Sequence, residues 1–277
     1  MDNIKLVTFT ELERFKNYLE ASLRKNEALN SILIGVLLQA KESTILSLGT
    51  CCQDSKLEIA WMLTHDKVLM LTEGSEKAIH LLADHFSKQH HNILRIRGAA
   101  YSVDTFIRLS RLGVCKSMMQ NVYELDKMIL QNRSPGQLRK AELSDITCLQ
   151  PWIEKYIAEA KLDYVDPNVL LLNLIGKERL YLWENNKTIL SMAASAGPTF
   201  TGIRINLVFT PQAYRGKGYA TSCVAALVNY LLQHGYSKCF LFADQENRTA
   251  NSIYKKMGFT LMGSYLDCTV AKDTEAS

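Results

Sequence analysis

The chain has 277 residues, 47% hydrophobic and 22% charged, which is the composition of an ordinary globular protein long enough for two domains. A net charge of +4 argues against a dedicated nucleic-acid surface, and the longest apolar run, Ile32–Leu38, is far shorter than the about 20 residues that span a membrane. The charged N-terminus does not resemble a signal peptide, so we expect a cytoplasmic protein with no nucleic-acid and no membrane partner.

The first 130 residues are expected to form an α/β domain, because helical and strand periodicities alternate along them. Helices are predicted at residues 9–23, 28–41, 75–85 and 102–112, and strands at residues 58–64, 68–72, 93–97 and 117–125. A segment of linker composition, Gln131–Gly136, follows. We therefore predict domains at residues 1–130 and 137–277.

The second domain begins with a predicted strand at residues 137–143, followed by a helix with Asp145 as its N-cap. Pro167 opens a second, short helix. A β-hairpin is predicted next, within residues 180–195.

A strand–loop–helix junction is the most informative part of the sequence. A strand of β-branched and aromatic residues, Ile203–Phe209, stops before Pro211, and a basic turn with Gly216 and Gly218 follows. Residues 220–231 then show a clear helical period. Backbone N–H groups and the positive end of the helix dipole converge at such a junction, which favours a bound phosphate. The turn matches neither the P-loop of nucleotide hydrolases nor the dinucleotide-binding fingerprint, and similar turns also occur in proteins that bind nothing.

A second pattern follows that helix. Gly235 ends the helix, Cys239–Ala243 is a predicted strand, and Asn247 is a candidate N-cap for a further helix that ends at Gly258. Tyr254 falls on the apolar face of that last helix, where a core tyrosine would also lie.

Together these two patterns resemble the two signatures of the GNAT superfamily of N-acetyltransferases. The first is Arg215-x-x-Gly218-x-Ala220, and the second is Asn247-x-x-x-Asn251-x-x-Tyr254-x-x-x-Gly258-Phe259. The resemblance covers the chain from Gln137 to its C-terminus. It implies an α/β (α+β) fold with a mixed, mostly antiparallel twisted sheet flanked by helices, preceded by a smaller or similar α/β domain. The N-terminal half carries neither signature, and we interpret it as a GNAT-like copy that lost cofactor binding, as in two-domain relatives of the glycine N-acyltransferase type, or as an unrelated α/β domain.

The resemblance implies an N-acyltransferase that uses acetyl-CoA, or another short acyl-CoA, and a small-molecule or peptide amine as acceptor. It implies that the strand before the loop bulges and diverges from the next strand, so that its backbone binds the pantetheine arm. The residues expected to bind the cofactor are Leu207, Val208, Phe209, Arg215, Gly216, Lys217, Gly218, Tyr219, Ala220, Asn247 and Asn251. Tyr254 is expected to protonate the leaving thiolate, and the N–H of Val208 or Phe209 to face the thioester oxygen.

This sequence departs from the family pattern at one point. Many members carry a glutamate on the strand before the loop as general base, but Ile203–Phe209 contains no carboxylate, and the amide of Asn206 cannot take up a proton. Glu184, Asp244, Glu246 and water are the other candidates, and the base stays unassigned. The missing carboxylate also keeps open a coenzyme A-binding regulatory or scaffold protein without turnover. Acyl transfer to oxygen is a third alternative.

The remaining residues predict no further chemistry. Four aromatic side chains either line the acceptor pocket or pack in the core: Tyr156, Tyr164, Trp183 and Phe200. The seven cysteines lack C-x-x-C spacing and are expected to be reduced and mostly buried, with Cys223 and Cys239 on core faces. The six histidines show no metal-ligand spacing, so we expect no metal, and a homodimer is left open.

Overall fold

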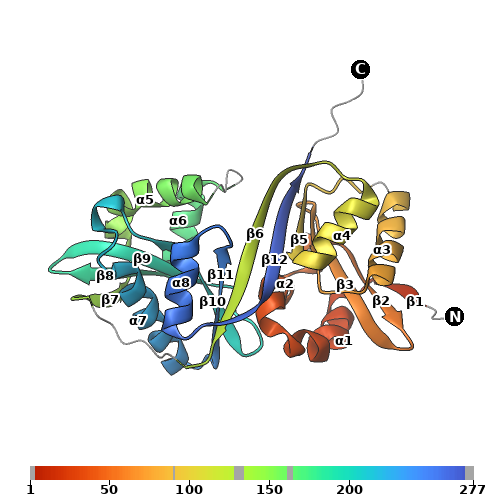
Figure 1. The fold of residues 1–277 in the computed structure, drawn as a ribbon, viewed down its shortest axis with the longest axis horizontal. Coiled ribbons are helices and arrows are strands. Elements are labelled where there is room, and N and C mark those ends of the chain that lie inside the picture. Colours follow the sequence, from red (N-terminus) through yellow and green to blue (C-terminus); the bar gives the residue numbers. More distant parts are fainter. Residues whose placement is uncertain (1–3, 90, 128–133, 161–164, 272–277) are drawn as a thin grey trace, which may run out of the picture. The chain divides into compact units, whose positions relative to one another are not determined.

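A computed structural model describes residues 4–89, 91–127, 134–160 and 165–271 (Figure 1). The chain divides into two compact units. The first contains Met1–Tyr123, Ala243–Asn251 and Leu261–Ser277, and the second contains Glu124–Phe242 and Ser252–Thr260. The predicted domain boundary near residues 130–137 stays a prediction, since it falls partly outside the described residues.

The two halves of the chain repeat one order of elements. The elements of the N-terminal half are β1 (Ile4–Phe9), α1 (Leu12–Lys25), α2 (Glu27–Gln39), β2 (Ile45–Gln53), β3 (Lys56–Thr64), β4 (Val68–Leu71), α3 (Glu76–Gln89), β5 (Arg95–Ala99), α4 (Ala100–Ser110) and β6 (Val114–Leu125). Those of the C-terminal half are β7 (Gln137–Lys140), α5 (Ile146–Glu159), α6 (Pro167–Gly176), β8 (Leu180–Asn185), β9 (Thr188–Ala196), β10 (Gly202–Phe209), α7 (Tyr219–Gln233), β11 (Lys238–Asp244), α8 (Arg248–Met257) and β12 (Thr260–Val270). The predicted likeness between the halves is therefore confirmed at the level of element order.

The predicted elements of the C-terminal half are all present, but β12 was not predicted there, and two strands of the N-terminal half were missed. β1 and β2 were not predicted, and Phe9, which was assigned to a helix, lies in β1. The left-handed residue Arg111 follows α4, so that helix ends before the predicted Gly113.

Strand pairing in both units is mixed and mostly antiparallel, as predicted. The strand order is β1-β2-β3-β4-β5-β12-β6 in the first unit and β11-β10-β9-β8-β7 in the second. The described parallel pairs are β4 with β5 and β10 with β11. The strand β12 pairs with β5, with Tyr265 opposite Ala99, so a strand from the C-terminal half belongs to the sheet of the first unit (Figure 1).

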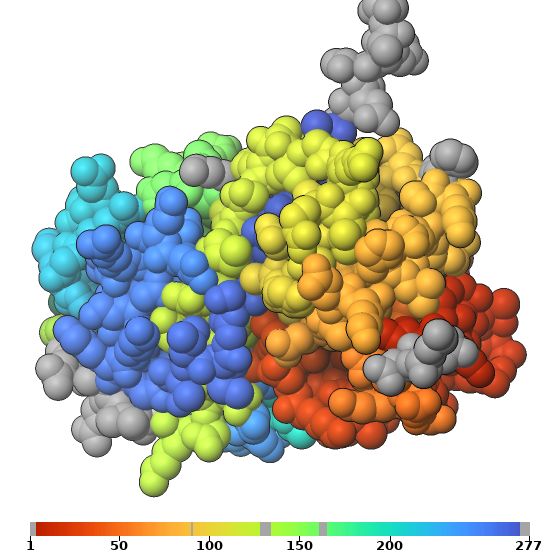
Figure 2. All heavy atoms as spheres, turned by 45° about the vertical axis from the view of Figure 1, so that its right-hand side comes forward, coloured from red at the N-terminus to blue at the C-terminus, as the bar shows by residue number. Residues whose placement is uncertain are grey.

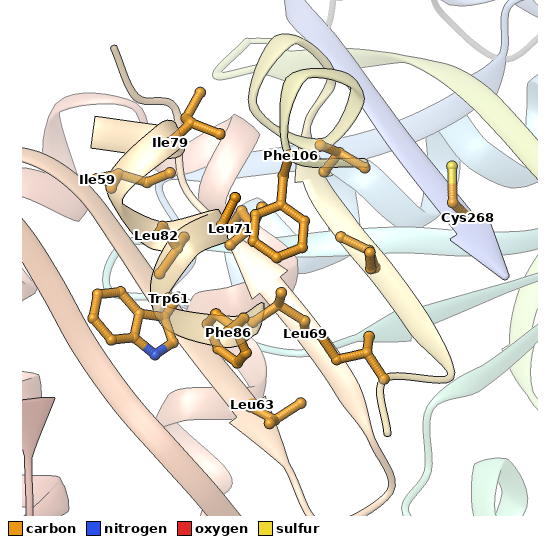
Figure 3. Close-up of a cluster of buried hydrophobic side chains, with 14 of the residues drawn as sticks. Ile59, Trp61, Leu63, Leu69, Leu71, Ile79, Leu82, Phe86, Phe106 and Cys268 are labelled. Carbon is orange, nitrogen blue, oxygen red and sulfur yellow. The ribbon is translucent and has the colours of Figure 1, made fainter. Parts of the chain in front are cut away.

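Each unit has its own hydrophobic core. In the first unit the core lies between the sheet and the helices α3 and α4, and the ring of Phe86 contacts those of Trp61 and Phe106 (Figure 3). The outer sides of α3 and α4 form much of the surface of this unit in the view of Figure 2, coloured orange to yellow. In the second unit α5 and α6 pack on β8, β9 and β10, and the buried side chains of Leu207 and Phe209 belong to this core.

Candidate active site

Strand β10 has a bulge near its C-terminal end. Its antiparallel register with β9 shifts between Asn206 and Phe209, where three steps along β10 match two steps along β9, from Ala194 to Met192. Leu207 has φ of 53°, a left-handed conformation that a leucine rarely adopts. The expected bulge is thus confirmed, and it lies at the position that the resemblance implied.

On its other side, β10 separates from β11. The described parallel ladder runs from Gly202 opposite Lys238 to Ile205 opposite Leu241 and continues no further among the described residues. Backbone groups beyond Ile205 are thereby left for another extended chain, in the manner of an added strand. The expected divergence of the two strands is confirmed.

The side chains of Leu207 and Phe209, on either side of Val208 at the bulge, are buried in the core. Leu207 and Phe209 are 3% and 4% exposed, and the Phe209 ring lies 6.1 Å from that of Trp152 on α5. Ser191 on β9 donates a hydrogen bond to the Phe209 carbonyl at 3.1 Å, and its hydroxyl lies 2.9 Å from that of Thr210. These contacts hold the end of β10, where the side chains of Leu207 and Phe209 point into the core.

The loop between β10 and α7 is exposed and has a left-handed backbone at two glycines. Gly216 and Gly218 have φ of 77° and 81°, which favours glycine, and Gly218 is the N-cap of α7 without any side-chain cap. A Cβ atom on Gly216 would meet no atom within 4 Å, and residues 215–218 are exposed. An uncapped helix N-terminus leaves backbone N–H donors and the positive dipole end available to an anion.

The side chain of Arg215 contacts both the turn and α5. Its Nε donates to the carbonyl of Thr210 at 2.8 Å, and its Nη2 donates to both carboxylate oxygens of Glu159 at 2.7 and 2.9 Å. The guanidinium also lies 5.6 Å from the centre of the Phe209 ring. Arg215 therefore joins the loop to the last residue of α5, and the amine of Lys217 stays exposed beside it, 3.4 Å from the carbonyl of Ala213.

Ser134 contacts the same loop, which the sequence did not indicate because this residue was assigned to a linker. Its hydroxyl donates to the carbonyl of Lys217 at 3.0 Å, and its N–H donates to the hydroxyl of Ser222 at 3.2 Å. A Cβ atom on Gly218 would stand 3.0 Å from the Ser134 hydroxyl. The chain before β7 thus closes one side of the turn.

Tyr254 lies on α8, half-buried, with its ring 5.8 Å from Phe259 in an edge-on arrangement. Burial raises the pKa of its phenol well above the ordinary value, and the phenol of Tyr156 on α5 raises it further. Tyr254 is therefore protonated at neutral pH, as a proton donor must be.

The two asparagines of the second signature have different surroundings. The carboxamide oxygen of Asn247 accepts from the N–H of Ala250 at 3.0 Å, which confirms its expected role as the N-cap of α8. Asn251 is 8% exposed and hydrogen-bonded on both sides of its amide, to Asn121 and Tyr123 on β6 and to the carbonyls of Asp244 and Asn247.

Two of the suggested bases are engaged elsewhere. Glu184 on β8 accepts from Arg139 at 2.6 Å, and the same guanidinium binds Asp145 at 2.7 and 2.8 Å. Arg139 lowers the pKa of Asp145. Asp145 is the N-cap residue of α5, as predicted, but its carboxylate is held by Arg139 and makes no capping hydrogen bond to the helix. The carboxylate of Asp244 accepts from the N–H of Glu246 at 2.9 Å, which is a local turn.

The aromatic residues considered for the acceptor pocket separate into three groups. Trp183 is 2% exposed and donates to the carbonyl of Pro135 at 3.2 Å, so it is a core side chain. Tyr156 and Phe200 are partly exposed, and Tyr156 packs against the core of the second unit. Tyr164 lies outside the described residues.

The corresponding place in the first unit is closed. β4 and β5 stay paired to the end of β4, where Leu71 lies opposite Gly98. A Cβ atom on Gly98 would stand 2.0 Å from the carbonyl oxygen of Leu71, so the two backbones are packed against each other. The turn that follows β4 carries Glu73, and α3 begins with Glu76, whereas the turn after β10 carries Arg215 and Lys217.

Comparison with known proteins identifies the second part of the chain. A profile described as the acetyltransferase (GNAT) family matches residues 147–259, which include the bulged strand, the glycine turn and Tyr254. Residues 147–259 are a GNAT acetyltransferase domain. Acyl-CoA is the general co-substrate of GNAT enzymes, and no curated protein matches this sequence.

The whole chain has the fold of tandem GNAT proteins. A GNAT acetyltransferase from Colwellia psychrerythraea matches with a TM-score of 0.60 and 14% identity over 97% of this chain and all (100%) of that one. A tandem GNAT protein of clavulanic acid biosynthesis matches with a TM-score of 0.57 and 9% identity over 99% and 100% of the two chains. A Drosophila protein matches with a TM-score of 0.63 and 11% identity over 98% and 99%. The GNAT-like fold expected for the N-terminal half is confirmed.

Two further observations concern the cysteines and the length of the helices. All seven cysteines are free, and Cys223 and Cys239 are fully buried, as expected. Within the part of the chain that the structure describes, no helix is long and apolar enough to cross a membrane.

Proposed function

We propose that this protein is an N-acyltransferase that moves an acetyl or other short acyl group from acyl-CoA to a primary amine. The observation that carries the proposal is the combination of a bulged, half-unpaired β10 with an uncapped N-terminus of α7 behind two left-handed glycines. The first offers backbone groups to a pantetheine arm, and the second offers N–H donors to a diphosphate.

In the proposed reaction, the acceptor amine attacks the thioester carbonyl carbon directly. The C–N bond forms, the C–S bond breaks, and the backbone N–H of Val208 or Phe209 stabilises the charge on the carbonyl oxygen. Tyr254 gives its phenolic proton to the leaving thiolate. Burial raises the pKa of the phenol, so the proton is in place at neutral pH, and the phenolate, which is more basic than the thiolate, regains a proton from solvent. The proton lost by the amine passes to solvent, since β10 offers no carboxylate.

Tyr254→Phe tests this assignment. We expect acyl transfer to an amine to slow by about 10²-fold, with the affinity for coenzyme A unchanged, because only the proton donor is removed. Tyr214→Phe, a tyrosine in the turn after β10, is the matched control. Equal rates for Tyr254→Phe and the control across the pH range would remove Tyr254 from this role.

A second candidate is a coenzyme A-binding regulatory or scaffold protein without turnover, which is favoured by the absence of a carboxylate on β10. Incubation with acetyl-CoA and a panel of amines, with release of free thiol as the readout, separates the two candidates. Thiol release that depends on the amine supports the enzyme, and tight binding of coenzyme A without release supports the second candidate.

A further inference from the structure

The carboxamide of Asn251 has no hydrogen-bonding capacity left for a cofactor. Its Oδ1 accepts from the Nδ2 of Asn121 and from the hydroxyl of Tyr123, both at 2.8 Å. Its Nδ2 donates to the carbonyls of Asp244 and Asn247, both at 2.8 Å. A side-chain amide can accept two hydrogen bonds and donate two, so the set is complete.

This amide lies at the centre of a larger polar network. Asn121 in turn accepts from the Nε2 of Gln245 at 3.1 Å, and that nitrogen also lies 3.0 Å from the hydroxyl of Ser264 on β12. The N–H of Gln245 donates to the carbonyl of Met119 on β6 at 3.0 Å. The network therefore connects β6, β12, the turn after β11 and the first turns of α8.

Its central members are shielded from water. Tyr123 is fully buried and Asn251 is 8% exposed, so water cannot take the place of the hydrogen bond between them. Losing one partner would leave a buried polar atom unsatisfied, which makes the geometry of the network well defined.

We propose that Asn251 is a positioning residue that fixes α8, and through it Tyr254, rather than a ligand of the cofactor. Asn251 and Tyr254 are three residues apart on α8 and so lie on the same side of the helix. Fixing the helix at Asn251 sets the axial rotation of α8, and with it the direction in which the Tyr254 phenol points. Tyr123 and Asn121 share this role, although neither belongs to a family signature. The inference rests on the proposed function of Tyr254.

Tyr123→Phe is the sharpest variant, because it removes one hydroxyl and leaves the Asn251 side chain intact. We expect kcat to fall about fivefold, as for one lost buried hydrogen bond, while the dissociation constant of coenzyme A changes less than about twofold. Amide hydrogen exchange in residues 251–257 should become faster by a similar factor. Tyr101→Phe, an exposed tyrosine on α4, is the matched control and should change none of these quantities.

The opposite results overturn the inference. If Tyr123→Phe matches the Tyr101→Phe control in kcat and in exchange of the α8 amides, the network does not position Tyr254. If Asn251→Ala raises the dissociation constant of coenzyme A tenfold or more while Tyr123→Phe leaves kcat unchanged, Asn251 is a cofactor ligand. A wild-type protein that binds no coenzyme A would refute the proposed function instead, and the exchange rates of α8 would then decide the anchoring role by themselves.

Discussion

Replacing Gly218 by alanine should damage the loop more than the same change at Gly216, although the two glycines have nearly the same backbone conformation. Their φ angles are 81° and 77°, so an alanine at either position incurs about 1–2 kcal/mol for a left-handed residue. The Cβ atom at Gly216 meets nothing within 4 Å, whereas that at Gly218 stands 3.0 Å from the hydroxyl of Ser134. That hydroxyl must shift by a few tenths of an ångström, which weakens its hydrogen bond to the Lys217 carbonyl and costs up to about 1 kcal/mol more.

The two variants can be compared by thermal unfolding and by calorimetric titration with coenzyme A. Gly218→Ala should melt up to about 2–4 °C below Gly216→Ala, from the extra cost of up to about 1 kcal/mol in a protein of this size. Both should bind coenzyme A at least about tenfold more weakly than the wild type, because relief of the left-handed strain turns the N–H groups away from the diphosphate. Equal melting temperatures would refute the role of Ser134. Unchanged affinity in both variants would refute the assignment of the turn as the diphosphate site.

Three other predictions follow from the structure. Arg139→Met should cost about 3 kcal/mol of unfolding free energy, because it leaves the carboxylates of Asp145 and Glu184 without a counter-charge. The control Lys140→Met breaks the exposed pair with Glu178 and should lower the urea midpoint much less, and equal urea midpoints for the two variants would contradict this. Burial, and then the charges of His91 and Lys88, lower the pKa of His85, so the unfolded chain binds a proton more readily than the folded one, and stability should fall as the pH drops below about 6.5. The urea midpoints measured at about pH 7.5 and about pH 5.5 should therefore differ less in His85→Gln than in the wild type. No difference between the two midpoints of the wild type would refute the reasoning. Calorimetry should find one coenzyme A per chain, since Gly98 and Leu71 close the first unit, and a stoichiometry of two would show that this gap opens.

Local signals were sufficient for most of the C-terminal half. The glycine turn, the N-cap at Asn247 and the helix opened by Pro167 were all predicted from the residue types at those positions, and the structure has them there. The bulge at Leu207 was different, because no residue in Ile203–Phe209 signals it, and only the resemblance placed it.

The missed features depend on residues far apart in the chain. β2 contains Ser, Gly and Thr in place of a clear apolar alternation. A glycine is required at position 49 of this strand because the Trp61 ring occupies the space where a Cβ atom would lie. The hydrogen bond from Tyr123 to Asn251 could not be found from spacing, because the two residues are 128 positions apart in the chain. Ser134 was assigned to a linker for the same reason, since Lys217 is 83 residues further along.

A crystal structure of the protein with coenzyme A bound would test the central claim most directly. We expect the diphosphate at the N-terminus of α7, beside Gly216 and Gly218, the pantetheine arm hydrogen-bonded to the backbone of β10 past the bulge, and the sulfur within hydrogen-bonding reach of the Tyr254 hydroxyl. Coenzyme A bound at another place, or a sulfur far from Tyr254 with the turn still empty, would contradict the account.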